Sequence, residues 1–235
     1  MQETVKIYRF LPAEWALKSL QTRRLKVSRL KELNDPFEWN IGTASSDAAV
    51  RSVARQALDS FLDHMNDQFG IICFSGSVRD PVIWSHYAQS HGGIALEFEH
   101  DIVDSLYRVE YLDERPVLNV NHLVQSDFDS SYTRSVLDKA LAKKAPSWKY
   151  EDEYRVHLNL SEECEMDGAL YFRRISDSFL SRVILGVRCT ASEADVARSL
   201  KQGGFGQGEV EVVRARMSDT AYEIDFESGE GEPRS

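Results

Sequence analysis

Charged residues occupy alternate positions in the segment EDEYRVHLNL, which runs from Glu151 to Leu160. In an extended strand, successive side chains point to opposite faces. The polar face then carries Glu151, Glu153, Arg155, His157 and Asn159, and the apolar face carries Tyr154, Val156, Leu158 and Leu160. The apolar face predicts that the strand packs on a core. The polar face is either the solvated side of an antiparallel sheet or part of an active site.

A carboxylate held on such a face can stabilise the positive charge that builds on a sugar when its glycosidic bond breaks. The effect is larger in a dry site than in water. Glu153 is the candidate for this role. Glu151 and Arg155 would fix the charge and position of Glu153, or Glu151 would guide an acceptor. We therefore expect Glu153 and Glu151 to be catalytic residues.

An arginine between aromatic residues stands out near the start of the chain, in Tyr8-Arg9-Phe10. The run from Val5 to Phe10 is rich in aromatic and β-branched residues, which predicts a first strand. A guanidinium can bind a phosphate through two parallel hydrogen bonds. We expect Arg9 to act in catalysis and ligand binding; the alternative is an edge-strand arginine that lies over the surface.

In the run from Phe69 to Ser75, both sets of alternate residues are mainly apolar. This pattern predicts a central strand that is buried on both faces of the sheet. It delivers Ser75 beside Gly76, where a ligand can approach the backbone. His86 follows on a short predicted helix and is either a catalytic histidine or a hydrogen-bonded structural one. The expected ligand contacts are Arg9, Phe74, Ser75, Ser77, Trp84, Tyr87, His91 and Arg155. The aromatic rings among them can stack on a planar ligand.

Two other chemistries compete with this interpretation. Carboxylates and an imidazole from Asp35, Glu38, Glu151, Glu153 and His157 could hold a divalent ion in a nuclease or phosphohydrolase. The local spacing, however, gives no complete ligand set, and Asp35 and Glu38 also fit a capped helix start with Phe37 and Trp39 as core anchors. Ser75 or Ser77 could act with His86 or His91 in hydrolysis, but no GxSxG elbow is present.

The elements that must position these groups follow from periodicity and turn residues. Strands are expected at 5–10, 25–30, 69–75, 92–99, 107–112, 151–160, 169–174, 181–188, 209–217 and 221–226. Helices are expected from Pro12, at 46–67 with Ser46 as cap, and at 81–89, 122–145 and 192–202. Because strands and helices do not alternate regularly, we expect one α+β domain over residues 1–227 with a mixed, mainly antiparallel sheet. The tail 228–235 is expected to be disordered.

The composition narrows the function classes. The chain has 235 residues, of which 42% are hydrophobic, and a formal net charge of -10. An acidic chain is repelled by nucleic acid, which argues against broad phosphate-backbone binding. No apolar run has the length that spans a bilayer, and the start has no secretory-signal pattern. Three scattered cysteines, Cys73, Cys164 and Cys189, indicate a reducing compartment, so a cytoplasmic protein is expected.

Taken together, the blocks NDPFE, CFS, WSHYAxxHGG and YExEYR resemble a widespread bacterial domain family of unknown function. The likeness runs from Tyr8 to about Phe226 and names no activity. A remoter resemblance is to the ADP-ribosyltransferases. In that family, an early strand bears Arg or His, a following strand ends in a Ser-containing motif, and a late strand carries Glu, often as Glu-x-Glu. Here Arg9, Ser75-Gly76-Ser77 and Glu151-Asp152-Glu153 occur in that order.

The second resemblance implies NAD as substrate. Arginine would contact its phosphate or ribose, the serine segment would shape the nicotinamide pocket, and glutamate would engage the nicotinamide ribose. Gly76 replaces the middle residue of Ser-Thr-Ser, and Tyr154-Arg155 follows the Glu-x-Glu where an apolar residue is more typical. We thus expect an enzyme that transfers ADP-ribose from NAD to an unknown macromolecule, as a toxin or phage-defence effector. The alternatives are the metal-dependent phosphohydrolase and a non-catalytic nucleotide- or partner-binding module.

Overall fold

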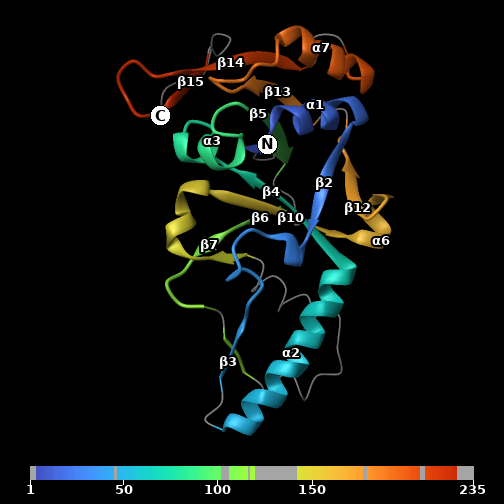
Figure 1. The fold of residues 1–235 in the computed structure, drawn as a ribbon, viewed down its shortest axis with the longest axis vertical. Helices are drawn as coiled ribbons and strands as arrows, with labels where there is room; N and C mark the ends of the chain where they lie inside the picture. Colours follow the sequence, from blue (N-terminus) through green and yellow to red (C-terminus); the bar gives the residue numbers. More distant parts are fainter. Residues whose placement is uncertain are drawn as a thin grey trace.

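The structure, a computed structural model, describes residues 4–44, 47–101, 106–115, 117–119, 142–176, 179–206 and 210–226. It is a single-domain α+β fold with a mixed, mostly antiparallel sheet. The helical elements are α1 (Ala13–Thr22), η1 (Leu30–Glu32), α2 (Ala48–Gln68), α3 (Pro81–Tyr87), η2 (Pro146–Glu151), α6 (Leu160–Glu163) and α7 (Glu193–Gln202). Figure 1 shows α2 with β3 at one end of the molecule and α7 with β13–β15 at the other.

The main sheet follows the order β11-β12-β2-β4-β1-β5-β13-β14-β15, and β10 pairs with β4 and β6. Its strands are β1 (Thr4–Leu11), β2 (Arg24–Arg29), β4 (Phe69–Ser75), β5 (Ile94–Asp101), β6 (Leu106–Arg108), β10 (Glu153–Asn159), β11 (Glu165–Asp167), β12 (Leu170–Arg174), β13 (Leu180–Leu185), β14 (Glu211–Met217) and β15 (Ile224–Phe226). Two short parallel pairs stand apart: β3 (Gly42–Ala44) with β8 (Val117–Asn119), and β7 (Glu110–Tyr111) with β9 (Lys143–Lys144).

Strand β4 changes its neighbour part of the way along one edge. Strand β10 pairs with β4 along its whole length, from Phe69 to Ser75. On the other edge, β2 pairs with Gly70 and Ile71, whereas β1 pairs only with Ser75. The sheet is therefore split between β1 and β2, and residues 72–74 of β4 lie at this split.

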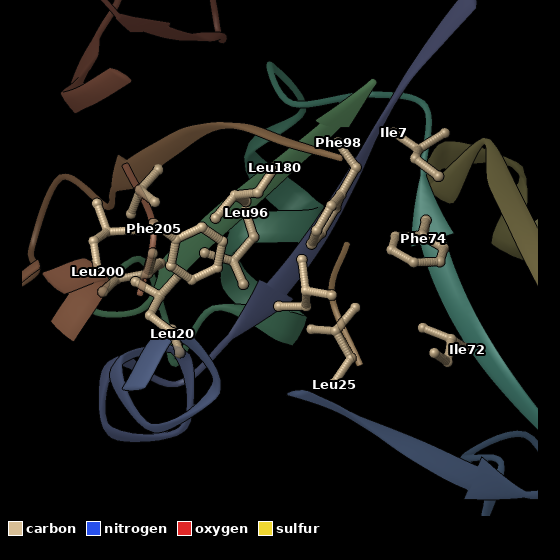
Figure 2. Packing of buried hydrophobic residues seen from close by; sticks show 14 of the residues in the cluster. Ile7, Leu20, Leu25, Ile72, Phe74, Leu96, Phe98, Leu180, Leu200 and Phe205 are labelled. Carbon is tan, nitrogen blue, oxygen red and sulfur yellow. The ribbon is translucent and has the colours of Figure 1, made fainter. Parts of the chain in front are cut away.

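Three hydrophobic clusters support the split from different sides. The first joins Phe74, Ile72 and Phe98 with α1 and α7, and Figure 2 shows Phe74 and Ile72 on the same side of β4. The second packs α2 against Trp39 and Ile71. The third packs α3 against β1 through Trp84 and Phe10, whose rings meet edge to face at 5.0 Å. Burial of these apolar side chains stabilises each cluster.

The expected α+β class is confirmed, and most expected elements are present within a few residues of their predicted bounds. Helix α2 begins one residue later than expected, because the side chain of Asp47 caps it by accepting from the amides of Ala49 and Val50. The strand expected at 107–112 is divided into β6 and β7. The predicted helix at 122–145 is wrong at its end, where Lys143 and Lys144 form β9; the rest of that prediction, like the tail 228–235, lies outside the described residues.

Candidate functional site

A cavity of about 210 Å³ opens at the split between β1 and β2, and we call it the split cleft. Arg9 from β1, Ser75 from β4 and Glu153 from β10 all line it. Its walls also include Tyr8, Phe10, Ser28, Glu32, Leu33, Asn34, Glu38, Cys73, Phe74, Ile83, Tyr87, Lys144 and Glu151. Neighbouring strands thus bring together residues that are far apart in the sequence.

Arg9 occupies the open edge of β4. Its Nη1 donates to the backbone carbonyl of Cys73 at 2.7 Å. This carbonyl lies between the residues of β4 that pair with β2 and the one that pairs with β1. Buried carbonyls need a partner, and here a side chain supplies it. A guanidinium has five N–H donors, so most remain for a ligand in the cleft.

Ser75 supports the turn behind the cleft. Its hydroxyl lies 2.6 Å from the carbonyl of Glu151 and accepts from the amide of Ser77 at 3.0 Å. Ser75 is therefore buried, and its hydroxyl is held by backbone groups. Gly76 follows, and its amide donates to the carbonyl of Asp152 at 2.7 Å. A Cβ at Gly76 would come within 2.3 Å of the Asp152 carboxylate, so this approach requires glycine.

The polar-faced strand begins at Glu153 rather than at Glu151. Glu151 ends η2, and Asp152 has a left-handed backbone with φ 41°. This kink brings the Glu151 side chain back toward Glu153, and both carboxylates face the cleft. The expected solvated alternative is wrong for the start of this face, because Glu151, Glu153 and Arg155 are all buried.

Two cations lie among three buried carboxylates. Lys144 Nζ is 2.6 Å from Glu151, 3.1 Å from Glu153 and 3.3 Å from Glu38. Arg155 donates from Nε and Nη2 to the two oxygens of Glu153, each at 2.8 Å, and Nη2 also pairs with Glu38. The buried carboxylates and cations of this cluster therefore compensate one another.

The two glutamates that line the cleft have pKa values displaced in opposite directions. Burial raises the pKa of Glu153, but Arg155 and Lys144 more than offset this and bring it to about 2. Burial raises the pKa of Glu151 above its ordinary value, against the opposing effects of Lys144 and Tyr87. Pairs of carboxyls separated in this way are typical of sites where one stays ionised and the other exchanges a proton.

Tyr87 connects α3 to this cluster. Its hydroxyl donates to Glu151 at 2.5 Å and accepts from the amide of Asn34 at 3.0 Å. Burial, followed by the hydrogen bond to Glu151, raises the pKa of Tyr87, so it stays protonated and keeps donating. On β7, the Tyr111 hydroxyl accepts from the amide of Glu153 at 2.9 Å. One tyrosine therefore contacts the carboxylate of Glu151, and the other contacts the backbone of Glu153.

Two of the rings expected to contact a ligand differ in their position. Trp84 is fully buried, donates from Nε1 to the carbonyl of Val78 and does not line the split cleft, so the structure does not place it against a ligand there. Phe74 is buried and packs against Phe98 in the first cluster, but it also lines the split cleft, so its contact with a ligand stays a prediction. Of the candidate rings, Tyr87 alone is a half-buried wall of the split cleft, among the residues that the structure describes.

The remaining candidates occupy other positions. His86 is exposed and its Nδ1 pairs with the Tyr150 hydroxyl at 2.9 Å. His91 lines a separate cavity beside residues 217–224. Ser77 lies behind Ser75, and Arg155 lies behind Glu153. Within the described ranges, none of these four lines the split cleft.

Sequence reasoning missed Lys144. It lies in a segment read as helix, and a two-residue strand has no periodicity that could reveal it. Asp35 and Glu38 lie in a turn rather than on a helix face, with Asp35 accepting from the amide of Phe37 at 2.9 Å. Trp39 is a core anchor as expected, but Phe37 is 63% exposed.

The carboxylates do not form a metal cradle. Among the described residues, no group of three or more His, Cys, Asp and Glu side chains is placed to hold a metal ion. Lys144 occupies the centre of the three glutamates, where a cation would have to lie. His157 stacks on Tyr107, with ring centroids 4.6 Å apart, farther along β10. These positions do not support the alternative of a divalent-ion site.

Comparisons with known proteins found one family. A family model described as "Protein of unknown function (DUF2971)" matches residues 83–156, less than a third of the chain. The matched stretch contains the WSHY and YEDEYR blocks, whereas NDPFE and CFS lie outside it. No curated protein and no solved structure matches the chain. Among the described residues, no helix has the length and apolar character needed to cross a bilayer. From α3 to the middle of β10, the chain is similar to this family of unknown function.

Proposed function

We propose that the chain is an ADP-ribosyltransferase-like enzyme that cleaves the bond between nicotinamide and ribose in NAD. The observation that carries this proposal is the arrangement of Arg9, Ser75 and Glu153 around one cleft. They come from the adjacent strands β1, β4 and β10, with Tyr8 opposite Ser75 and Ser75 opposite Glu153 in the pairing. This is the order of groups that the resemblance to ADP-ribosyltransferases requires.

The size of the cleft supports binding of one end of the dinucleotide. Sites for whole drug-sized ligands measure about 300–1,000 Å³, and the split cleft measures about 210 Å³. Nicotinamide and its ribose would enter the cleft, and the remainder of NAD would lie outside. Arg9 at the open edge of β4 would bind a phosphate, and Tyr87 offers a ring edge or face to nicotinamide.

The charge distribution suits a dissociative reaction. When the glycosidic bond breaks, its electron pair moves onto the pyridinium nitrogen, and positive charge builds on the ribose ring. Glu153 is ionised, because its pKa is about 2, and it is fixed by two hydrogen bonds from Arg155. A preorganised carboxylate stabilises this developing charge without reorientation during the reaction.

Glu151 would serve the second half of the reaction. A nucleophilic oxygen or nitrogen of the acceptor attacks the ribose carbon and must lose a proton. Glu151 has a raised pKa and lines the same cleft, so it can receive that proton. The acceptor is a macromolecule in this proposal, as for a toxin or phage-defence effector. The free thiols of Cys73, Cys164 and Cys189 agree with a cytoplasmic setting.

The alternatives make different predictions about ligands. The metal-dependent phosphohydrolase requires a cation where Lys144 already neutralises the glutamates, so it has the weaker geometric support. A non-catalytic module would bind NAD or another nucleotide in the split cleft and release nothing. Turnover therefore separates the leading proposal from the binding module.

The test is to incubate the purified chain with NAD labelled in the adenylate part, with and without cell lysate. Liquid chromatography measures free nicotinamide, and gel autoradiography measures label on macromolecules. The proposal expects nicotinamide release and transferred label from the wild type. Binding of NAD without either product would leave only the binding-module alternative.

A further inference from the structure

Lys144 contacts three parts of the chain at the cluster. Its ammonium contacts Glu38 from the 35–39 turn, Glu151 at the end of η2 and Glu153 at the start of β10. Its side chain is 3% exposed and lies over the Trp148 ring, with Nζ 4.8 Å from the centroid. A lysine buried to this degree is stable only when carboxylates neutralise it.

The two cleft glutamates depend on Lys144 to different degrees. Glu153 has a second cation, because Arg155 donates to both of its oxygens at 2.8 Å. For Glu151, Lys144 is the cationic partner found among the described residues, at 2.6 Å, and Tyr87 is its neutral donor. Removing Lys144 would therefore leave Glu153 paired and Glu151 without a compensating charge.

We propose that Lys144 is a positioning residue that sets the protonation of Glu151, while Arg155 secures the charge of Glu153. This inference rests on the proposed function, in which Glu151 accepts the proton of the acceptor. Lys144 would favour the ionised form of Glu151 despite its burial, and this is the form that can receive the proton. Arg155 would keep Glu153 ionised through the whole reaction.

Other charged and titratable groups around Glu151 act on it from each neighbouring element. The acidic groups of the cluster and cleft are Glu38, Glu153 and Glu32, and the basic ones are Lys144, Arg155 and Arg9. Tyr87 on α3, Tyr111 on β7 and Tyr150 in η2 face the same group, and all three have raised pKa values through burial first. Cys73 on β4 also has a raised pKa, so it is a neutral thiol at physiological pH. Lys144 is thus the group whose loss changes the field at Glu151 most.

The experiment compares Lys144→Met with Lys143→Met, its sequence neighbour, which pairs loosely with Glu110 at 3.9 Å outside the cluster. Nicotinamide release is measured against pH, and the Glu151 carboxyl is followed by carbon NMR, with its signal assigned by Glu151→Gln. An opposite charge in direct contact shifts a pKa by about 1–3 units. Lys144→Met is expected to move the acid limb and the Glu151 titration upward by at least about one unit, and Lys143→Met to leave both in place. Unchanged Glu151 titration in Lys144→Met would overturn the inference.

Glu38→Gln provides an opposite test that does not bury an unpaired carboxylate. It removes one of the three anions that share Lys144, so Lys144 acts more strongly on Glu151, and the Glu151 titration is expected to move downward. If Lys144→Met does not fold, the inference is tested on Glu38→Gln instead. A Glu151 pKa that rises or stays unchanged in Glu38→Gln would overturn the inference. The NMR titration needs no turnover. Absence of nicotinamide release in the wild type would therefore reject the proposed function and still leave the assignment of Lys144 tested.

Discussion

Arg9 on β1 donates a hydrogen bond from Nη1 to the backbone carbonyl of Cys73 on β4, at 2.7 Å. The carbonyl lies where the sheet splits, so the guanidinium takes the place of a neighbouring strand. This bond fixes the direction of the Arg9 side chain, which lines the split cleft. The break between β1 and β2 therefore positions the guanidinium at the cavity.

Replacing Arg9 by Lys is expected to weaken NAD binding more than it slows the reaction. Lysine keeps the charge but loses the forked geometry that matches a phosphate. A hydrogen bond to a charged group contributes about 1.5–3 kcal/mol, so the Kd for NAD should rise about tenfold or more. Calorimetric titration measures this, with Arg51→Lys on the exposed face of α2 as the control. A lower kcat at unchanged Kd would contradict the phosphate role.

Glu153 should make the folded state sensitive to acid. Its folded pKa of about 2 lies below the ordinary value of 4.5, so ionised Glu153 stabilises the fold above pH 4.5. That contribution is lost as the pH falls from 4.5 toward 2. Glu151 acts with the opposite sign, because its folded pKa is raised. Urea unfolding of wild type and Glu153→Gln should show a steeper acid loss for the wild type; equal losses would disprove this linkage.

Gly76→Ala is expected to affect stability and the site together. The new Cβ would come within 2.3 Å of Asp152 Oδ2 and 2.9 Å of Tyr154 Cε2. Overpacking of this kind costs about 1–3 kcal/mol, and it displaces the turn that places Glu151 and Glu153. Thermal unfolding measures the cost, and adding Asp152→Ala should recover part of it by removing the nearest atom. Full stability of Gly76→Ala alone would show that this approach is not required.

Tyr87→Phe should shift the pH dependence of turnover upward. The substitution removes the donor that contacts Glu151 at 2.5 Å, and this hydrogen bond lowers the pKa of Glu151. The acid limb of the pH profile should therefore move to higher pH, by less than in Lys144→Met, because a neutral donor is lost rather than a charge. Tyr222→Phe, at a side chain that is 99% exposed, is the matched control. If the acid limb does not move in Tyr87→Phe, the hydrogen bond from Tyr87 does not affect the pKa of Glu151.

The sequence was sufficient for the fold class because period-two and helical patterns mark the strands and helices of one α+β domain. It also indicated which face of β10 carries the charges. It could not show that this face is buried, since burial of Arg155 depends on Glu38, which is 117 residues away. A contact between residues that are so far apart in the sequence produces no repeating pattern of residue types around either of them.

The candidate site was only partly visible for the same reason. Arg9, Phe74, Ser75, Glu151 and Glu153 line the split cleft, but Trp84 does not, because its ring is fully buried in the core. Lys144 has no motif, and its importance arises from three carboxylates that the fold brings around it. The left-handed turn at Asp152, which separates Glu151 from the strand, involves a residue type that tolerates this conformation without demanding it.

The most direct measurement is nicotinamide release from NAD by the wild type beside Glu153→Gln, with Glu110→Gln, an exposed glutamate, as the control. Circular dichroism establishes that all three proteins fold, and calorimetry establishes that they bind NAD. Loss of a preorganised charge costs about 10²–10³ in rate. The account predicts a loss of this size in Glu153→Gln and none in Glu110→Gln. A folded, NAD-binding Glu153→Gln protein that releases nicotinamide at the wild-type rate would contradict it.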